Sequence, residues 1–342
     1  MSASSNAASI DIRDANAWRL RPTLTWRAVL VVVLAVVILT YSGQRTEMHK
    51  LASLTLQALS STVGFAPQSQ VSDGFARVVG GMFPLQLSDV RETSRIANFD
   101  PAHLPLGAYL ETRSNKQTTI DPQTLQQKTL TTSVEVLVEP YGYVMQVARL
   151  LLQTIEIAVW ATVLALVIAF PCASLAATNY TPHSLIYAVV RAGSAFLRAV
   201  PELISALLLV LIFGFGPIAG VLALGLHTAG FLCKFFAEDI ENADRAPQDA
   251  LRALGANKLK VLRFAVLPLV GSSYLAYLQY ILERNIRSAT VIGIVGAGGI
   301  GQELKGRFEM FDFGHVGTIL FAILLTVFML ELLTGRLRRR FI

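Results

Sequence analysis

The sequence predicts an all-α membrane protein with six transmembrane helices and a polar external insertion between the first and second of them. Composition is the first reason, because 53% of the 342 residues are apolar and 15% are charged, against about 25% charged in a soluble domain. The apolar residues also form runs that match a span of about 20 residues or its centre. These runs are residues 28–41, 155–170, 203–213, 218–236 and 316–333.

The basic residues predict the orientation. The net charge of +6 does not indicate a nucleic-acid partner, because the basic residues stand at the ends of apolar runs and not on one polar face. Lys and Arg beside spans mark the cytoplasmic side, so both termini should be cytoplasmic and the number of spans even. The groups are Arg13, Arg19, Arg21 and Arg27 before the first run, and Arg336, Arg338, Arg339 and Arg340 after the last.

The N-terminal part should consist of a cytoplasmic tail (1–27), a first transmembrane helix (28–43) and a periplasmic region (44–147). Arginines followed by an apolar run also resemble a secretory signal. No small-x-small cleavage site follows Tyr41, which favours an uncleaved helix.

The periplasmic region has two different patterns. Leucines at helical spacing between Met48 and Met82 predict helices that lie on the membrane surface or pack on the spans. Residues 107–140 alternate in a Thr- and Gln-rich pattern, which predicts a small insertion that contains β-structure. Within it we expect a turn at residues 114–116 and a strand at residues 133–138.

Residues 148–335 should form a core of five further spans, followed by a basic tail at 336–342. The expected spans are residues 149–171, 186–213, 217–236, 264–286 and 316–333. The third of these five has small residues at close spacing, which allow helix backbones to approach each other. They are Gly216, Gly220, Gly225, Ala229 and Gly230.

The cytoplasmic loop at residues 238–263 predicts two short helices. Pro247 suits the first position of a helix, and Gly255 can adopt the left-handed conformation that ends one. Asn257 can then cap a second helix that leads into the next span. The result should be a helical elbow outside the membrane, with Leu251 and Leu254 available to a partner.

This loop resembles the coupling loop of binding-protein-dependent ABC permeases, whose pattern is Glu-Ala-Ala, three residues, Gly, nine residues, Ile, one residue, Leu-Pro. Asp249-Ala250-Leu251, Gly255, Ala265 and Leu267-Pro268 stand at those spacings, with Asp for Glu, Leu for the second Ala and Ala for Ile. The resemblance implies that this helix docks into a groove of an ATPase subunit. The residues it assigns to ATPase coupling are Asp249, Ala250, Leu251, Arg252, Leu254, Gly255, Leu267 and Pro268.

A narrower resemblance, over about residues 153–342, is to the permeases of phosphonate importers. Its most specific block is Arg287-Ser-Ala-Thr-Val-Ile-Gly-Ile-Val-Gly-Ala-Gly-Gly-Ile-Gly-Gln302. It implies the type I ABC importer permease fold in a bacterial inner membrane, two copies of this chain, two ATPase subunits that hold ATP and Mg, and a periplasmic phosphonate-binding protein. No catalytic residue, cofactor or metal is expected in this chain, which has no phosphate loop. Residues 107–140 do not fit the compact members of that family.

The segment from Gly296 to Gly301 also satisfies the dinucleotide-binding pattern Gly-x-Gly-x-x-Gly. That site needs a strand before it and a parallel sheet around it, and the flanking spans leave no room for one. Two interpretations remain. Gly296, Gly298, Gly299 and Gly301 either expose amides to an anion in a substrate pathway or form a tight turn without substrate contact.

Charged residues in or near spans need a reason, since each costs about 2.5–3.5 kcal/mol at the centre of a helix. They are Glu156, Glu202, Lys234, Glu283, Arg284 and Arg287. Guanidinium groups bind phosphorus oxyanions, so Arg284 and Arg287 are hypothesised to line the outer cavity, with snorkelling to the headgroups as the alternative.

The other polar residues favour structural roles. Glu283 should pair with a basic residue on its helix, Glu202 should pair within the bundle, and His227 is more typical of a histidine bonded to a neighbouring helix than of a proton relay or metal ligand. Cys172 and Cys233 are interpreted as packing residues.

Alternatives to phosphonate remain for the solute. Phosphite, hypophosphite, phosphate or an unrelated small solute such as methionine are each compatible with the coupling loop. An ion-driven secondary transporter, or a membrane-anchored oxidoreductase with a nucleotide at Gly296–Gly301, would work without an ATPase.

Overall fold

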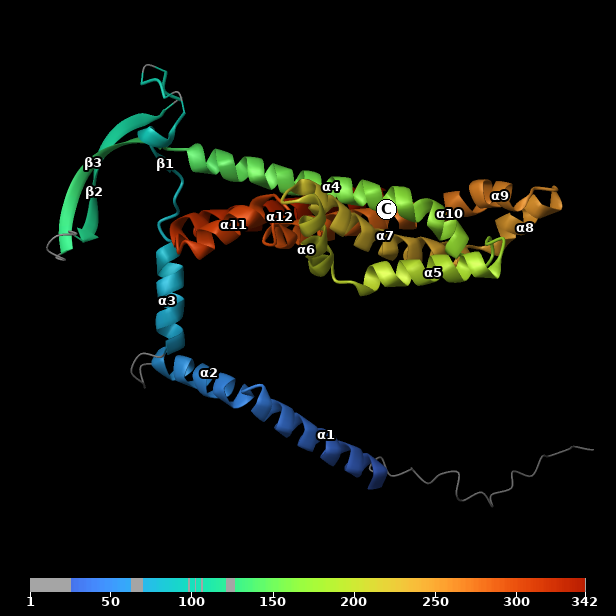
Figure 1. Ribbon diagram of the computed structural model, residues 1–342. Helices are drawn as coiled ribbons and strands as arrows, with labels where there is room; N and C mark the ends of the chain where they lie inside the picture. The colour runs from blue at the N-terminus through green and yellow to red at the C-terminus, as the bar shows by residue number, and fades with distance from the viewer. Residues whose placement is uncertain are drawn as a thin grey trace, which may run out of the picture. The chain divides into compact units, whose positions relative to one another are not determined.

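The computed structural model describes residues 26–62, 70–97, 99–101, 103–105, 107–120 and 127–341. The chain divides into two compact units, Met1–Arg77 and Val78–Ile342. Each unit is considered by itself. Figure 1 shows the long helices and the one sheet of the described residues.

The first unit contains α1 (Trp26–Arg45), α2 (Met48–Thr62) and most of α3 (Gln70–Met82). Helix α1 includes the predicted first span, and α2 and α3 are the helices expected between Met48 and Met82. A bend of 73° separates residues 29–45 from residues 48–57. The predicted tail at 1–27 lies outside the described residues apart from its last two positions.

Among the described residues, the second unit contains four helices that are long and apolar enough to cross a membrane. The number of spans rises to six if each of two bent pairs is one span, and one of these pairs belongs to the first unit. Helix α4 (Gly142–Ala176) continues through Pro171, and α7 (Pro217–Asn242), α10 (Leu267–Gly293) and α12 (Phe313–Phe341) all extend beyond their predicted ends. The predicted basic tail therefore continues α12 as far as Phe341.

The predicted span at residues 186–213 is bent and not one straight helix. Two helices occupy this segment, α5 (Ser184–Ala199) and α6 (Glu202–Phe213), and they meet at 90°. Pro201 lies at the break, where it has no N–H to donate to the Leu197 carbonyl and disfavours helical conformation in Val200. The bundle therefore contains a helix break at this point.

One antiparallel sheet precedes α4. Its order is β1-β3-β2, where β1 is Asp89–Glu92, β2 is Tyr109–Ile120 and β3 is Gln127–Glu139. A 3-10 turn, η1 (Thr93–Arg95), follows β1. The predicted strand at 133–138 lies within β3 and is confirmed, whereas the predicted turn at 114–116 is wrong, because these residues pair with β3 inside β2. The connection at residues 121–126 lies outside the described residues.

The core is built on close packing of α4 against α7. Ala158, Ala161, Ala165 and Ala169 recur at helical spacing on α4 and are completely buried. A Cβ atom added to Gly225 of α7 would lie 2.7 Å from Cδ2 of Leu164. Gly220 and Gly230 are equally close to their neighbours, so three of the predicted glycines allow close approach, as expected where helices associate in lipid, whereas Gly216 has nothing within 4 Å.

A chain of polar side chains crosses the same core. Thr228 of α7 donates to Oδ1 of Asn285 over 3.0 Å, and Nδ2 of Asn285 donates to Thr162 of α4 over 3.0 Å. All three side chains are buried. Polar groups in the membrane need partners of this kind, so these hydrogen bonds fix the register of α4, α7 and α10.

Candidate functional site

At one end of the bundle, a short helix with well-defined caps projects from it (Figure 1). This is α8 (Arg245–Ala253), whose N-cap residue Asp244 accepts a hydrogen bond from the amide of Ala246 over 3.1 Å. Pro247 therefore occupies the third helical position and not the predicted first. Gly255, with φ of +80°, ends the helix as predicted, and the amides of Gly255 and Ala256 bond to the carbonyls of Arg252 and Leu251. This is a Schellman arrangement.

The exposed face of α8 includes residues from the coupling-loop pattern. Asp249, Ala250 and Arg252 are exposed, and Leu254 is 83% exposed. Nη1 of Arg252 lies 3.0 Å from Oδ1 of Asp249, so these two charges pair on the surface. Leu251 is half-buried. An apolar side chain this exposed, at the end of a capped helix, is suited to contact with a partner.

Leu267 and Pro268 do not join this face. Between them and α8 stand α9 (Lys258–Val261), capped by Oδ1 of Asn257 as predicted, and a π-helical turn, η2 (Leu262–Val266). Pro268 cannot donate to the Phe264 carbonyl, and a local π turn is one of the adjustments that accommodate this loss in a membrane helix. Leu267 and Pro268 thus shape the entry into α10, while α8 carries the exposed surface.

The opposite face of α8 is attached to the bundle by Gln248, which is 3% exposed. Its Oε1 atom accepts from the hydroxyl group of Tyr180 over 2.9 Å, and its Nε2 atom donates to the carbonyls of Ala243 and Asp244. Tyr180 belongs to the loop between α4 and α5. That loop is itself held by Glu241 of α7, which accepts from the amide of Thr178 over 2.8 Å.

A second polar group surrounds the break between α5 and α6. Nδ1 of His227, on α7, lies 3.1 Å from the Val200 carbonyl oxygen and 3.3 Å from that of Leu197. Because carbonyl oxygens only accept, Nδ1 donates, and it satisfies the Leu197 carbonyl that Pro201 leaves without a partner. The predicted role of His227, a bond to a neighbouring helix, matches this geometry.

On the other side of the His227 ring, Nε2 faces two charged groups. Nη2 of Arg284 lies 3.0 Å from it and Oε2 of Glu202 lies 3.3 Å from it. Oε1 of Glu202 also accepts from Ser288 over 3.2 Å, so Glu202 does pair within the bundle. The guanidinium group of Arg284 stacks on the Phe231 ring, 4.7 Å from its centroid.

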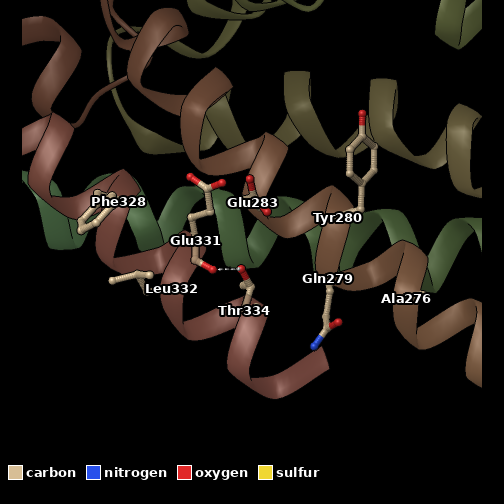
Figure 2. Close-up of a pocket in the computed structure, with 9 residues that line it drawn as sticks. Ala276, Gln279, Tyr280, Glu283, Phe328, Glu331, Leu332 and Thr334 are labelled. Carbon is tan, nitrogen blue, oxygen red and sulfur yellow. Dashed lines mark hydrogen bonds between the residues drawn. The ribbon is translucent and has the colours of Figure 1, made fainter. Parts of the chain in front are cut away.

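Arg287 lies one turn farther along α10 and pairs with Glu283 of the same helix, Nη1 to Oε1 over 2.6 Å. The partner expected for Glu283 is therefore Arg287. An open pocket of about 460 Å³ lies between α10 and α12, and Glu283 is one of the residues that line it. Figure 2 shows Glu283 and Glu331 entering it from the two helices. Two carboxylates repel an anion, so the pocket by itself is not an anion site.

The glycine-rich segment is buried. Gly296, Gly298 and Gly299 have φ of +95°, +83° and +74°, and the segment from Gly296 to Gly301 is covered by neighbouring elements. The amide of Ile300 donates to Oγ1 of Thr154 on α4 over 2.9 Å. This burial favours the tight turn over the exposed-amide interpretation. Arg284 and Arg287 make their contacts with His227 and Glu283, not with these glycines.

The two cysteines line one cavity of about 190 Å³ between α4, α5 and α7, together with small and apolar residues. Cys233 is buried and Cys172 is half-buried. In the part of the chain that the structure describes, no group of three or more His, Cys, Asp or Glu residues is placed to hold a metal ion.

The sequence model of the binding-protein-dependent transport system inner membrane component family matches residues 167–342, more than half of the chain. The chain belongs to this family. It is therefore the permease subunit of an ABC importer and not an enzyme, and it functions with a separate ATPase and a substrate-binding protein.

Known relatives place this permease more narrowly. It is 49% identical over 261 residues to the putative phosphite transport system permease protein HtxE of Stutzerimonas stutzeri, covering 76% of this chain and 100% of that one. It is 44% identical over 193 residues to the phosphite transport system permease protein PtxC of that species, covering 56% of this chain and 70% of that one. It is 40% identical over 195 residues to the phosphate-import permease protein PhnE of Mycolicibacterium smegmatis, covering 56% of this chain and 36% of that one.

A solved structure confirms the fold. An inward-facing form of the MetNI methionine ABC transporter matches 57% of this chain and 96% of that chain, with a TM-score of 0.51 and 20% identity. The expected type I importer permease architecture is therefore confirmed.

Sequence reasoning missed one polar cluster of this permease. Helix α11 (Ile300–Glu309) carries Arg307, whose Nε lies 2.8 Å from Glu303 and whose Nη1 lies 3.1 Å from Asp312. Nδ1 of His315 lies 2.7 Å from the same Asp312 carboxylate, and Arg307 stacks on the Tyr143 ring. Glu303 and Arg307 are four residues apart, a spacing at which opposite charges pair on one face of a helix, so the sequence does indicate this part of the cluster.

Proposed function

We propose that this permease moves a phosphorus oxyanion, of the phosphite, phosphonate or phosphate class, into the cytoplasm of a bacterium. The observation that carries the proposal is the similarity along the whole length of HtxE, a putative phosphite permease. Two further relatives whose names refer to phosphite and phosphate support the same class.

The charges at membrane depth are consistent with an anionic solute. Arg198 on α5 and Arg284 and Arg287 on α10 carry guanidinium groups, and Glu202 acts on Arg284 while Glu283 pairs with Arg287. Arg198 contacts the Ser194 carbonyl and the Phe231 ring. Guanidinium is the side-chain group that best matches phosphorus oxyanions, so we assign Arg284 and Arg287 to the solute pathway.

The orientation follows from the basic ends of the chain. Both termini lie in the cytoplasm, and α8 faces the same compartment. Two copies of this chain form the pathway with two ATPase subunits, which hold the ATP and Mg. The exposed face of α8, with Asp249, Ala250 and Leu254, docks into the ATPase. Closure of the ATPases moves α8 and turns the pathway outward to receive the solute from a periplasmic binding protein.

The test is ATP hydrolysis by the complete complex, reconstituted in lipid with its ATPase and binding protein. Phosphite, hypophosphite, methylphosphonate, phosphate and methionine are each offered, and stimulation by a phosphorus oxyanion is the expected result. Stimulation by methionine alone would overturn the assignment of the solute. Uptake that follows an ion gradient without ATP would instead identify a secondary transporter.

Coupling through α8 is tested at Gly255. Proline cannot adopt φ of +80° and has no amide for the bond to Arg252, so Gly255→Pro should abolish stimulation. Gly255→Asn is the matched control, because Asn tolerates the left-handed conformation and keeps the amide. For the pathway, Arg287→Ala should reduce transport in a complex that still assembles, and unchanged transport would remove Arg287 from it.

A further inference from the structure

The contacts of Glu202 resemble those that an oxyanion would make. Its carboxylate accepts from the Ser288 hydroxyl over 3.2 Å and faces Nε2 of His227 at 3.3 Å. It is also the first residue of α6, at the positive end of a helix that starts inside the bundle. The Ser288 hydroxyl, the Arg284 guanidinium group whose charge acts on this carboxylate, and the helix N-terminus are donors that suit a phosphorus oxyanion as well as a carboxylate.

These contacts are not mutually compatible. Since Nδ1 of His227 donates to carbonyl oxygens, a neutral ring has only an acceptor at Nε2. That acceptor takes the hydrogen bond of Arg284 at 3.0 Å, and the Glu202 carboxylate then faces a second acceptor at 3.3 Å. A charged ring would donate to Glu202 but would repel Arg284. Either way one contact is poor, so Glu202 is weakly held on this side.

The charge around the cluster favours an additional anion. Arg198 and Arg284 both stack on Phe231, with their guanidinium carbons 5.9 Å and 4.7 Å from the ring centroid. Two like charges gathered at one ring are stabilised by negative charge nearby, and Glu202 supplies a single one. The Glu202 side chain is 29% exposed, whereas that of His227 is 7% exposed. The carboxylate therefore has room to withdraw while His227 stays fixed.

We propose that Glu202 is a resident counter-anion which the transported oxyanion displaces from Arg284, Ser288 and the N-terminus of α6. The inference rests on the proposed function and adds its regulation. Glu202 occupies the site when it is empty, and its return after the solute has bound promotes release. The site thereby avoids two failures of an anion pathway, which are an uncompensated buried charge when empty and an anion held too tightly when occupied.

The test is equilibrium binding of radiolabelled phosphite, with methylphosphonate as competitor, to the permease–ATPase complex in lipid nanodiscs without the binding protein. Glu202→Gln keeps the shape and removes the charge, so it should bind phosphite about tenfold more tightly, the factor of one charge-assisted hydrogen bond. With the binding protein present, its maximal transport rate should fall because release slows. Glu156→Gln, an exposed carboxylate on α4, is the matched control and should change neither quantity.

Glu202→Asp provides a second variant, since its shorter side chain keeps the charge but moves the carboxylate away from the site. Its affinity for phosphite should lie between those of the wild type and Glu202→Gln. A purely structural role of Glu202 would lower the yield of the complex without tightening binding. Unchanged or weaker binding in a variant that assembles overturns the inference, as does absence of binding in all variants while the wild-type complex transports phosphite. Failure of the wild type to respond to any phosphorus oxyanion would instead overturn the proposed function.

Discussion

The hydroxyl group of Tyr180 donates a hydrogen bond to Oε1 of Gln248 over 2.9 Å, and this bond joins the loop after α4 to the buried face of α8. Burial raises the pKa of the Tyr180 hydroxyl, so it remains a donor at neutral pH. Gln248 uses its amide group as well, on the carbonyls of Ala243 and Asp244. The movement of α8 that we propose would therefore reach α4 and α5 through a side chain that is bonded at both ends.

Tyr180→Phe should consequently weaken the coupling of ATP hydrolysis to transport. The variant loses one hydrogen bond and leaves Oε1 of Gln248 without its donor. A buried acceptor without a donor lowers the stability of that conformation by about 1–3 kcal/mol. The measurement is the ratio of solute transported to ATP hydrolysed in the reconstituted complex, which should fall. Tyr187→Phe is the control, because its ring still stacks with Arg191. An unchanged ratio in Tyr180→Phe would show that the bond only supports the loop.

Gly301 should not tolerate a methyl group. A Cβ atom there would lie 2.9 Å from Cα of Gly293 and would collide with the Thr290 carbonyl, both of them backbone that cannot rotate away. Gly301→Ala should lower stability by about 1–3 kcal/mol, as overpacking does, measured as the melting temperature of the solubilised protein. Gly271→Ala, where nothing lies within 4 Å of the added atom, should melt at the same temperature or higher.

Acid should destabilise the cluster around Asp312. Burial acts to raise the pKa of this carboxyl, but the hydrogen bonds and charges of His315 and Arg307 outweigh it and hold the pKa below its usual 3.8. A lowered folded-state pKa contributes stability that is present above the ordinary pKa and is lost as pH falls through the folded-state value. The contribution should therefore persist to about pH 4 and disappear below it.

Asp312→Asn tests this dependence, because an amide keeps the size of the group and does not titrate. Its melting temperature should be lower than that of the wild type at neutral pH, and the difference should shrink in acid. Asp100→Asn is the control, because its carboxylate pairs with His103 at an exposed position, where such a pair contributes little to stability. A difference that stays constant between neutral pH and pH 3 would show that the charge of Asp312 does not stabilise the fold.

Local signals predicted local structure. Gly255 and Asn257 were assigned correctly because a helix stop or cap depends on one residue and its immediate neighbours. Residues 114–116 were assigned wrongly because polar residues inside a long strand carry the same composition as a turn. Pro201 was available in the sequence as a helix breaker, but the apolar run on both sides concealed the break.

Pairs that are distant in the sequence could not be predicted in this way. Tyr180 and Gln248 are 68 residues apart, and Ser288 and Glu202 are 86 apart. The polar side chains of these residues indicate that each needs a partner, since buried polar groups are hydrogen-bonded. For Glu202 the sequence predicts such a pair. Which partner each one finds depends on how α4, α6, α7 and α10 pack, and no local pattern contains that information.

Arg284 should not be replaceable by lysine. Its planar guanidinium group reaches Nε2 of His227 over 3.0 Å and stacks on Phe231, and an ammonium group cannot do both. Arg284→Lys keeps the charge, so a pathway that needs only positive charge would transport normally. A site that needs the planar, bidentate guanidinium group should lose transport by about tenfold or more. Arg149→Lys, an exposed position on α4, is the control for the substitution itself. Initial uptake rates at saturating solute distinguish the two outcomes, because they report movement through the membrane and not capture by the binding protein.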